Sequence, residues 1–204
     1  MLKSEIDVRK LVLTGMLAAV AGVLMSLEFS IPFMPPFYKI DFSSVPAFIA
    51  IFTIGPWSGL AVELIKIAIK LMTVGTSSMY VGETVSTLTA IVTVFLMWFI
   101  YQRTRNSKRG IVLALILSGM IHILAACGMN AFVSIPMYAH AMGMDMNSLV
   151  KAVGAGNPLI TNLPAFIIFA TIPFNIIKIT LNSVAAYYIF MAVRRSELVS
   201  LKMA

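Results

Sequence analysis

Five apolar stretches constrain this chain more than any other feature, at about residues 10–28, 46–73, 80–102, 110–135 and 160–193. Each approaches or exceeds the ~20 residues that a helix needs to cross the hydrocarbon core of a membrane. Hydrophobic residues make up 60% of the 204-residue sequence and charged residues only 11%, whereas soluble domains carry about 25% charge. The sequence therefore predicts an all-α integral membrane protein that forms a single domain over residues 1–204.

Ten of the 15 basic residues gather in three clusters that flank the apolar stretches. They are Lys3, Arg9 and Lys10, then Arg103, Arg105, Lys108 and Arg109, and finally Arg194, Arg195 and Lys202. Such clusters are typical of cytoplasmic segments, so the net charge of +7 does not indicate nucleic-acid binding. An even number of spans must then separate each pair of clusters. Dividing 46–73 at Gly55-Pro56 satisfies this condition and predicts six transmembrane helices with both termini cytoplasmic; a re-entrant helix pair is the alternative.

The segment between the first two apolar stretches, residues 31–46, is too rich in proline to form a helix. Its four prolines lack backbone donors and fix their own φ angles, and four aromatic residues accompany them. An ordinary exposed loop would be less apolar. We expect a long ordered outer loop between helices 1 and 2 that closes a small-molecule pocket, and an aromatic anchor at the membrane interface is the alternative.

Two further segments, 75–80 and 136–158, fall on the outer side in the same span order. The second contains glycines and prolines and a short amphipathic turn at Met146–Val153. The outer side is therefore where the longer loops gather.

Polar residues form a stripe on the last predicted helix, where Asn175, Lys178 and Asn182 follow the spacing i, i+3, i+7 of one helical face. Asn130 lies near the outer end of the preceding helix. Amides and an ammonium group suit a flat ring that carries carbonyls and an N–H. Hydrogen bonding between helices is the alternative for the asparagines, whereas Lys178 has no carboxylate partner on its own helix.

Other ionisable residues have structural explanations. Glu63 and Lys66 can form an ion pair within one helix. Glu83 follows Gly82 at the start of a helix, where a carboxylate is favoured by the helix dipole. His122 is interpreted as a hydrogen-bonded interior histidine, because His140 is its only companion and no metal site is expected.

The motifs of catalysis are absent from the sequence. It contains no G-x-x-x-x-G-K-[ST], H-E-x-x-H or G-x-S-x-G, and its single Cys127 excludes an internal disulfide. We expect no enzyme activity and no catalytic cofactor. A membrane enzyme that uses Glu63, Glu83 or His122 as an acid or base is the alternative from another class, and a purely structural membrane subunit is a further one.

Small residues on the first helix form the patterns Gly15-x-x-x-Ala19 and Ala18-x-x-x-Gly22. Such patterns allow close contact between membrane helices. The contact could be made with a partner chain or within this chain.

Several of these motifs together resemble the riboflavin-binding S-component of energy-coupling factor transporters. They are Ile31-Pro-Phe-Met-Pro-Pro-Phe-Tyr-Lys-Ile-Asp-Phe-Ser-Ser-Val-Pro46, Gly55-Pro56, Glu63-Leu-Ile-Lys66, Gly75-Thr-Ser-Ser-Met-Tyr-Val-Gly-Glu83, Asn130 ahead of Pro136, and Asn175-x-x-Lys178. The resemblance spans nearly the whole chain in the same order. One departure is Ser86, which stands where the family frequently has Asn.

The resemblance implies a subunit in a prokaryotic cell membrane that captures riboflavin in an outward-facing pocket. It implies docking onto a transmembrane coupling subunit and two cytoplasmic ATPases, through small residues of the first helix: Gly15, Ala18, Ala19 and Gly22. The implied ligand-binding residues are Ile40, Asp41, Ser43, Met79, Tyr80, Gly128, Asn130, Asn175 and Lys178. A flavin nucleotide or another vitamin is the alternative ligand.

The residues are compatible with the flavin that the resemblance implies. The uracil-like edge of isoalloxazine has two carbonyls and an N–H, which Asn130, Asn175 and Lys178 can satisfy. The aromatic side of the ring can be enclosed by Phe33, Phe37, Phe42 and Tyr80.

Overall fold

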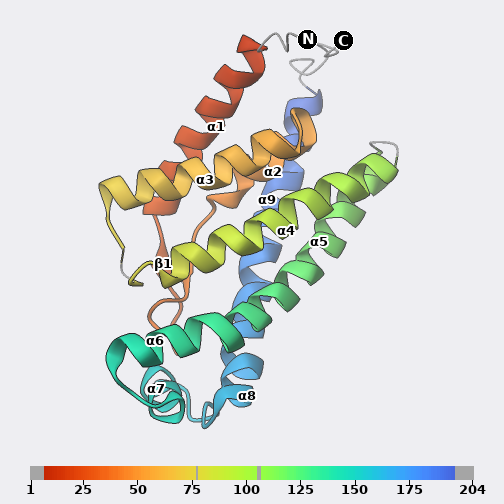
Figure 1. The fold of residues 1–204 in the computed structure, drawn as a ribbon. Coiled ribbons are helices and arrows are strands. Elements are labelled where there is room, and N and C mark those ends of the chain that lie inside the picture. The colour runs from red at the N-terminus through yellow and green to blue at the C-terminus, as the bar shows by residue number, and fades with distance from the viewer. Residues whose placement is uncertain (1–6, 77, 105–106, 196–204) are drawn as a thin grey trace, which may run out of the picture.

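The computed structural model describes residues 7–76, 78–104 and 107–195, and their architecture is almost entirely helical (Figure 1). The helices are α1 (Val8–Ser26), α2 (Ser44–Thr53), α3 (Pro56–Thr73), α4 (Val81–Arg103), α5 (Lys108–Met129), α6 (Ile135–Met142), α7 (Met146–Val153), α8 (Leu163–Phe166) and α9 (Ile172–Arg195). Single π-helical turns, η1 (Asn130–Ser134) and η2 (Ile167–Thr171), join α5 to α6 and α8 to α9.

Four helical rods among the described residues are long and apolar enough to cross a membrane. They are Val8–Ser26, Val81–Arg103, Lys108–Met142 and Leu163–Arg195. Large apolar side chains are exposed along these rods, such as Val112, Ile116 and Met120 on α5, as expected for surfaces that face lipid. The chain is an all-α membrane protein; the six crossings stay a prediction, because α2 is short and α3 is interrupted by charged residues.

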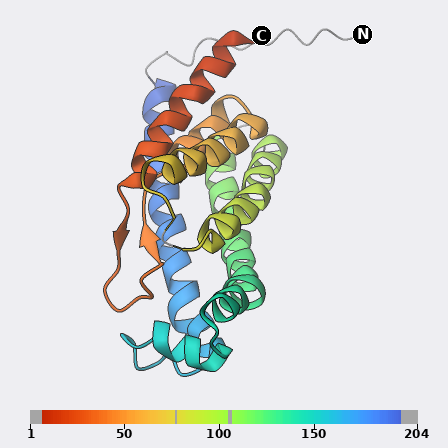
Figure 2. The ribbon, with the colours of Figure 1, turned by 60° about the vertical axis from the view of Figure 1, so that its left-hand side comes forward.

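The start of α1, the end of α4, the start of α5 and the end of α9 lie at the same end of the bundle (Figures 1 and 2). Among the basic clusters, Arg9, Lys10, Arg103, Lys108, Arg109, Arg194 and Arg195 belong to this end, whereas Lys3, Arg105 and Lys202 lie outside the described residues. Helices α6, α7 and α8 cover the opposite end. The helix directions therefore agree with the arrangement that the charge clusters predict.

The break at Gly55-Pro56 is confirmed. Gly55 has a φ of 142°, a conformation that only glycine adopts easily, and Pro56 is the first residue of α3. The predicted turn at Met146–Val153 is also a helix with these bounds, and the Asp145 carboxylate caps it by accepting from the backbone N–H groups of Asn147 and Ser148.

The predicted end of the fourth apolar stretch, near residue 135, is wrong. The helix continues through η1 into α6 and ends only at Gly143, whose φ of 62° suits a helix terminus. Pro136 lies two residues after the end of the π-helical turn η1, and Pro173 lies two residues after the end of η2. Because a proline ring clashes with the carbonyl four residues earlier, a wider turn before it lets the helix continue.

Residues 27–43 connect α1 to α2 and contain a small antiparallel pair of strands, β1 (Phe29–Ser30) and β2 (Lys39–Ile40). Phe29 is opposite Ile40, and Ser30 is opposite Lys39. Figure 2 shows both strands beside the lower part of α9. This arrangement brings the polar end of β2 toward the last helix.

The small residues of α1 do not all face the same surroundings. Ala18 is fully buried with Ala47, Ala50 and Val62 of α2 and α3. A Cβ on Gly22 would lie 2.7 Å from the side chain of Ile69 on α3. The partner-docking role of Gly15, Ala18, Ala19 and Gly22 stays a prediction, and two of the four, Ala18 and Gly22, also make close contacts within the chain. Gly15 and Ala19 remain exposed.

Candidate ligand-binding site

A cavity of about 190 Å³ lies inside the bundle, between the α1–α2 connection and helices α2, α3, α4, α5 and α9. Its lining combines aromatic rings, among them Phe37, Tyr38 and Phe174, with many polar side chains. Convergent polar groups combined with aromatic walls are typical of a small-molecule site.

One group of polar contacts joins α9 to the α1–α2 connection. The Lys178 ammonium donates to Asp41 Oδ2 at 2.8 Å, which supplies the carboxylate that its own helix lacks. Asn182 Nδ2 donates to the Asp41 carbonyl at 2.9 Å and to the Lys178 carbonyl at 3.0 Å. Asp41 Oδ1 also accepts from the backbone N–H and the hydroxyl of Ser43. These bonds fasten the connection onto α9.

The charge state of Asp41 follows from these neighbours. Burial acts to raise the pKa of this carboxyl group, but the ammonium groups of Lys178 and Lys66 and the hydrogen bonds outweigh burial. The pKa is therefore held well below its usual value, and Asp41 is ionised at neutral pH.

A second group of contacts centres on Tyr38. Its hydroxyl donates to Asn130 Oδ1 at 3.1 Å and shares a hydrogen bond of 2.7 Å with Thr171 Oγ1. Its ring stacks on Phe174, with 4.4 Å between the ring centroids. Asn130 donates one amide N–H to the Ala126 carbonyl on α5, and Asn175 donates one to the Thr171 carbonyl on η2. These bonds hold both amides at the cavity wall.

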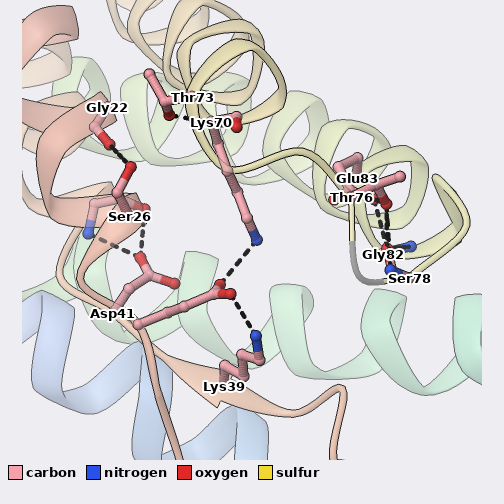
Figure 3. A network of polar contacts seen from close by, with 12 residues as sticks. Gly22, Ser26, Lys39, Asp41, Lys70, Thr73, Thr76, Ser78, Gly82 and Glu83 are labelled. Atoms are coloured by element: carbon pink, nitrogen blue, oxygen red, sulfur yellow. Dashed lines mark hydrogen bonds and ion pairs between the residues drawn. The ribbon is translucent and has the colours of Figure 1, made fainter.

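A third group lies where α1 ends. Glu28 accepts from Lys39 at 2.6 Å and from Lys70 at 2.8 Å, and Figure 3 shows both lysines pointing toward the carboxylate that joins them. Burial acts to raise the pKa of Glu28, but the hydrogen bonds from the two lysines outweigh it and lower the pKa below its usual value. Glu28 therefore links the β2 strand to α3 as a carboxylate.

The predicted ion pair of α3 is present. Glu63 and Lys66 lie 2.6 Å apart, both buried, and Lys66 also donates to Ser44 Oγ at 3.0 Å. His122 is hydrogen-bonded as expected, through Nδ1 to Thr93 Oγ1 at 2.9 Å. Glu63, Lys66 and His122 were interpreted from the sequence as structural, yet all three line the cavity.

Five of the nine predicted ligand-binding residues line the cavity: Asp41, Ser43, Asn130, Asn175 and Lys178. The other four, Ile40, Met79, Tyr80 and Gly128, do not. Ile40 is buried beside Tyr38, whereas the side chains of Met79 and Tyr80 are more than half exposed in left-handed backbone conformations ahead of α4. The ligand-binding role of all nine stays a prediction.

Sequence reasoning missed a polar face on α4. Glu83, Ser86 and Thr93 line the cavity together with Thr89. Ser86, Thr89 and Thr93 follow Glu83 by three, six and ten residues, which places all four on one side of the helix, so the signal was present in the sequence. Glu28 and Tyr38 carried no such signal, because their partners are distant in the chain. Within the described ranges, no three His, Cys, Asp or Glu side chains gather to hold a metal ion.

Comparison with known proteins identifies the family of this chain. The profile of the family described as "ECF transporter, substrate-specific component" matches residues 9–190. The chain belongs to this family of substrate-specific (S) components.

Two relatives of this S component cover most of its length. Riboflavin transporter RibU of Staphylococcus aureus is 33% identical over 83% of this chain and 82% of its own. Riboflavin transporter FmnP of Bacillus subtilis is 31% identical over 92% of this chain and 93% of its own. A solved S component of a bacterial ECF transporter has 27% identity and a TM-score of 0.63, covering 97% of this chain and 99% of that chain.

Proposed function

We propose that this S component binds riboflavin with high affinity and delivers it for uptake through an energy-coupling factor module, without catalytic activity of its own. One observation carries the proposal: Asn130, Asn175 and Lys178 line the same cavity as Phe37, Tyr38 and Phe174. The relatives named as riboflavin transporters support the same ligand.

The polar groups suit the edge of an isoalloxazine ring. An asparagine amide has two N–H donors and one carbonyl acceptor, and an ammonium has three donors. The contacts that Asn130 and Lys178 make within the protein use only part of this capacity. The remaining donors can bind the two ring carbonyls, while the flat apolar part of the ring lies among the aromatic side chains.

The source of energy lies outside this chain in our proposal. Its sequence has no P-loop, so ATP hydrolysis would be supplied by two cytoplasmic ATPases that act through a transmembrane coupling subunit. We propose that the exposed Gly15 and Ala19 form part of the docking surface, since small residues let a partner helix approach closely. The chain would cross a prokaryotic cell membrane six times, with both termini cytoplasmic.

The test is titration of the detergent-purified protein with riboflavin, followed by quenching of flavin fluorescence as the ring is enclosed. We expect nanomolar affinity, equivalent to about 12 kcal/mol. Asn175→Leu should weaken binding at least about tenfold, since a buried hydrogen bond to the ring is lost. Asn147→Leu, at an exposed position of α7, is the matched control and should bind like the unsubstituted protein.

Two outcomes would contradict the proposal in different ways. Unchanged affinity of a folded Asn175→Leu variant would remove this residue from the site. No quenching by riboflavin in the unsubstituted protein would exclude the flavin and leave an S component for another vitamin.

A further inference from the structure

The cavity lining contains four carboxylates and four ammonium groups, which are not matched one to one. The carboxylates are Glu28, Asp41, Glu63 and Glu83, and the ammonium groups are Lys39, Lys66, Lys70 and Lys178. Asp41 and Glu63 each pair with one lysine, and Glu28 pairs with two. Among the residues that the structure describes, Glu83 has no cationic partner. It is therefore a buried carboxylate without an ion-pair partner at the cavity wall.

The hydrogen bonds of Glu83 are all made on one oxygen. Its Oε2 accepts from the Ser78 hydroxyl at 2.5 Å and from the Thr76 hydroxyl at 3.2 Å. Over the described part of the chain, Oε1 receives no hydrogen bond. The side chain is 7% exposed and lines the cavity, so this second oxygen is an acceptor for whatever enters.

The surroundings hold Glu83 firmly in this position. Ser78 Oγ accepts from the backbone N–H of Gly82, and Thr76 Oγ1 accepts from the N–H groups of Ser78 and Tyr80. The hydroxyls that donate to Glu83 are therefore themselves fixed by the turn that precedes α4. In Figure 3 this group lies on the opposite side of the view from Asp41, the partner of Lys178.

The two sides of the cavity thus differ in chemistry. The side of Asn175 and Lys178 offers hydrogen-bond donors, whereas Glu83 offers only an acceptor that carries a full negative charge. A carboxylate accepts strongly from hydroxyl groups. It repels a phosphate, which carries about −1.5 to −2 charge at neutral pH and, when ionised, lacks donors.

We propose that Glu83 binds the hydroxyl chain of the ligand and selects an unphosphorylated polyol against its phosphate ester. This inference rests on the proposed function, because it requires the flavin ring to lie on the side of Asn175 and Lys178. The ribityl chain of riboflavin then extends along α4 toward Glu83, past Ser86 on the same face. FMN would place its phosphate against an unpaired buried carboxylate.

Two lysines pair with the single carboxylate of Glu28, so this group is an alternative binding place for the phosphate of FMN. Lys39 and Lys70 share a single carboxylate, and both also line the cavity. Each already donates to Glu28 at 2.6 to 2.8 Å, so a phosphate would have to displace that carboxylate or insert beside it. The Lys70→Met variant separates the two locations, since it should change FMN affinity only if the phosphate binds there.

The experiment measures the dissociation constants of riboflavin, FMN and lumiflavin, in which a methyl group replaces the ribityl chain, for the purified protein in detergent. We expect the unsubstituted protein to prefer riboflavin over FMN at least about tenfold, the effect of one hydrogen bond to a charged group. Glu83→Gln should weaken the binding of riboflavin, strengthen the binding of FMN and leave the binding of lumiflavin unchanged. The preference for riboflavin over FMN should therefore fall about tenfold or more. Asp145→Asn is the matched control, because it removes one negative charge outside the cavity while Asn caps a helix as well as Asp does.

A second variant keeps the proposal testable if Glu83→Gln does not fold. Glu83→Asp withdraws the carboxylate by one methylene but keeps its charge. The affinity for riboflavin should therefore fall relative to the affinity for lumiflavin, while FMN should still bind more weakly than riboflavin. The proposal is overturned by an unchanged ratio of riboflavin to FMN affinity in Glu83→Gln, or by selective loss of FMN in Lys70→Met. Failure of all three flavins to bind the unsubstituted protein would instead refute the proposed function, and this inference with it.

Discussion

The ion pair between Asp41 and Lys178 provides a direct test of what holds the α1–α2 connection onto α9. The two side chains come from positions far apart in the sequence and lie 2.8 Å apart. Their exposure differs: the Asp41 side chain is 4% exposed, whereas the Lys178 side chain is 29% exposed. Removing either partner should therefore have unequal consequences.

Lys178→Met leaves Asp41 as a buried carboxylate with only the Ser43 hydrogen bonds and the nearby Lys66. Breaking a buried pair in this way costs about 3–5 kcal/mol, and the remaining donors place the expected loss near ~3 kcal/mol. Asp41→Asn leaves Lys178, whose ammonium can reach water or other acceptors, so we expect a loss of about 1–2 kcal/mol. The double variant should lose less than the sum of the two single variants.

The assay is equilibrium unfolding in mixed detergent micelles, without ligand, for the four proteins of the double-mutant cycle. Leaving out the ligand separates stability from any contact that Lys178 makes with a flavin. We expect a coupling energy of at least about 1 kcal/mol. Losses that add within about 0.5 kcal/mol, or an Asp41→Asn variant less stable than Lys178→Met, would refute the reasoning.

Three further outcomes follow from the structure. Gly22→Leu should lower the free energy of unfolding by about 1–3 kcal/mol in thermal or denaturant unfolding, because the new side chain would collide with Ile69. Gly15→Leu should leave stability unchanged and impair uptake in cells that supply the coupling module. Equal stability of both variants would contradict the packing of α1. The pKa of Glu28 is lowered by its lysines, so the stability that it contributes is present above pH 4.5, its ordinary pKa, and is lost as the pH falls through the folded value. The difference in melting temperature between the unsubstituted protein and Glu28→Gln should thus be largest at neutral pH and shrink in acid. A difference that does not change with pH would contradict a stabilising role of ionised Glu28. Tyr38→Phe should lose about 1–2 kcal/mol of unfolding free energy, because Asn130 Oδ1 is left without its buried donor, and an unchanged unfolding curve would show that this bond contributes nothing.

Local interactions were predictable from the sequence. The break at Gly55-Pro56, the ion pair of Glu63 with Lys66 and the helix at Met146–Val153 all depend on residues within one turn of each other. The apolar stretches likewise predicted the membrane helices, because few other structures are compatible with their length and composition. The end of α6 was missed because a π-helical turn can absorb a proline, and no residue pattern in η1 distinguishes that turn from a helix end.

Only the tertiary structure decided how distant polar groups meet. It paired Lys178 with Asp41 and placed Glu28 between Lys39 and Lys70. It also turned Ala18 and Gly22 toward α2 and α3 while leaving Gly15 exposed, although all three belong to the small-residue patterns of the first helix. The sequence by itself determined that polar residues would face the interior, since lipid excludes them. Which of them became partners, and which carboxylate stayed unpaired at the cavity wall, depended on how the helices packed against one another.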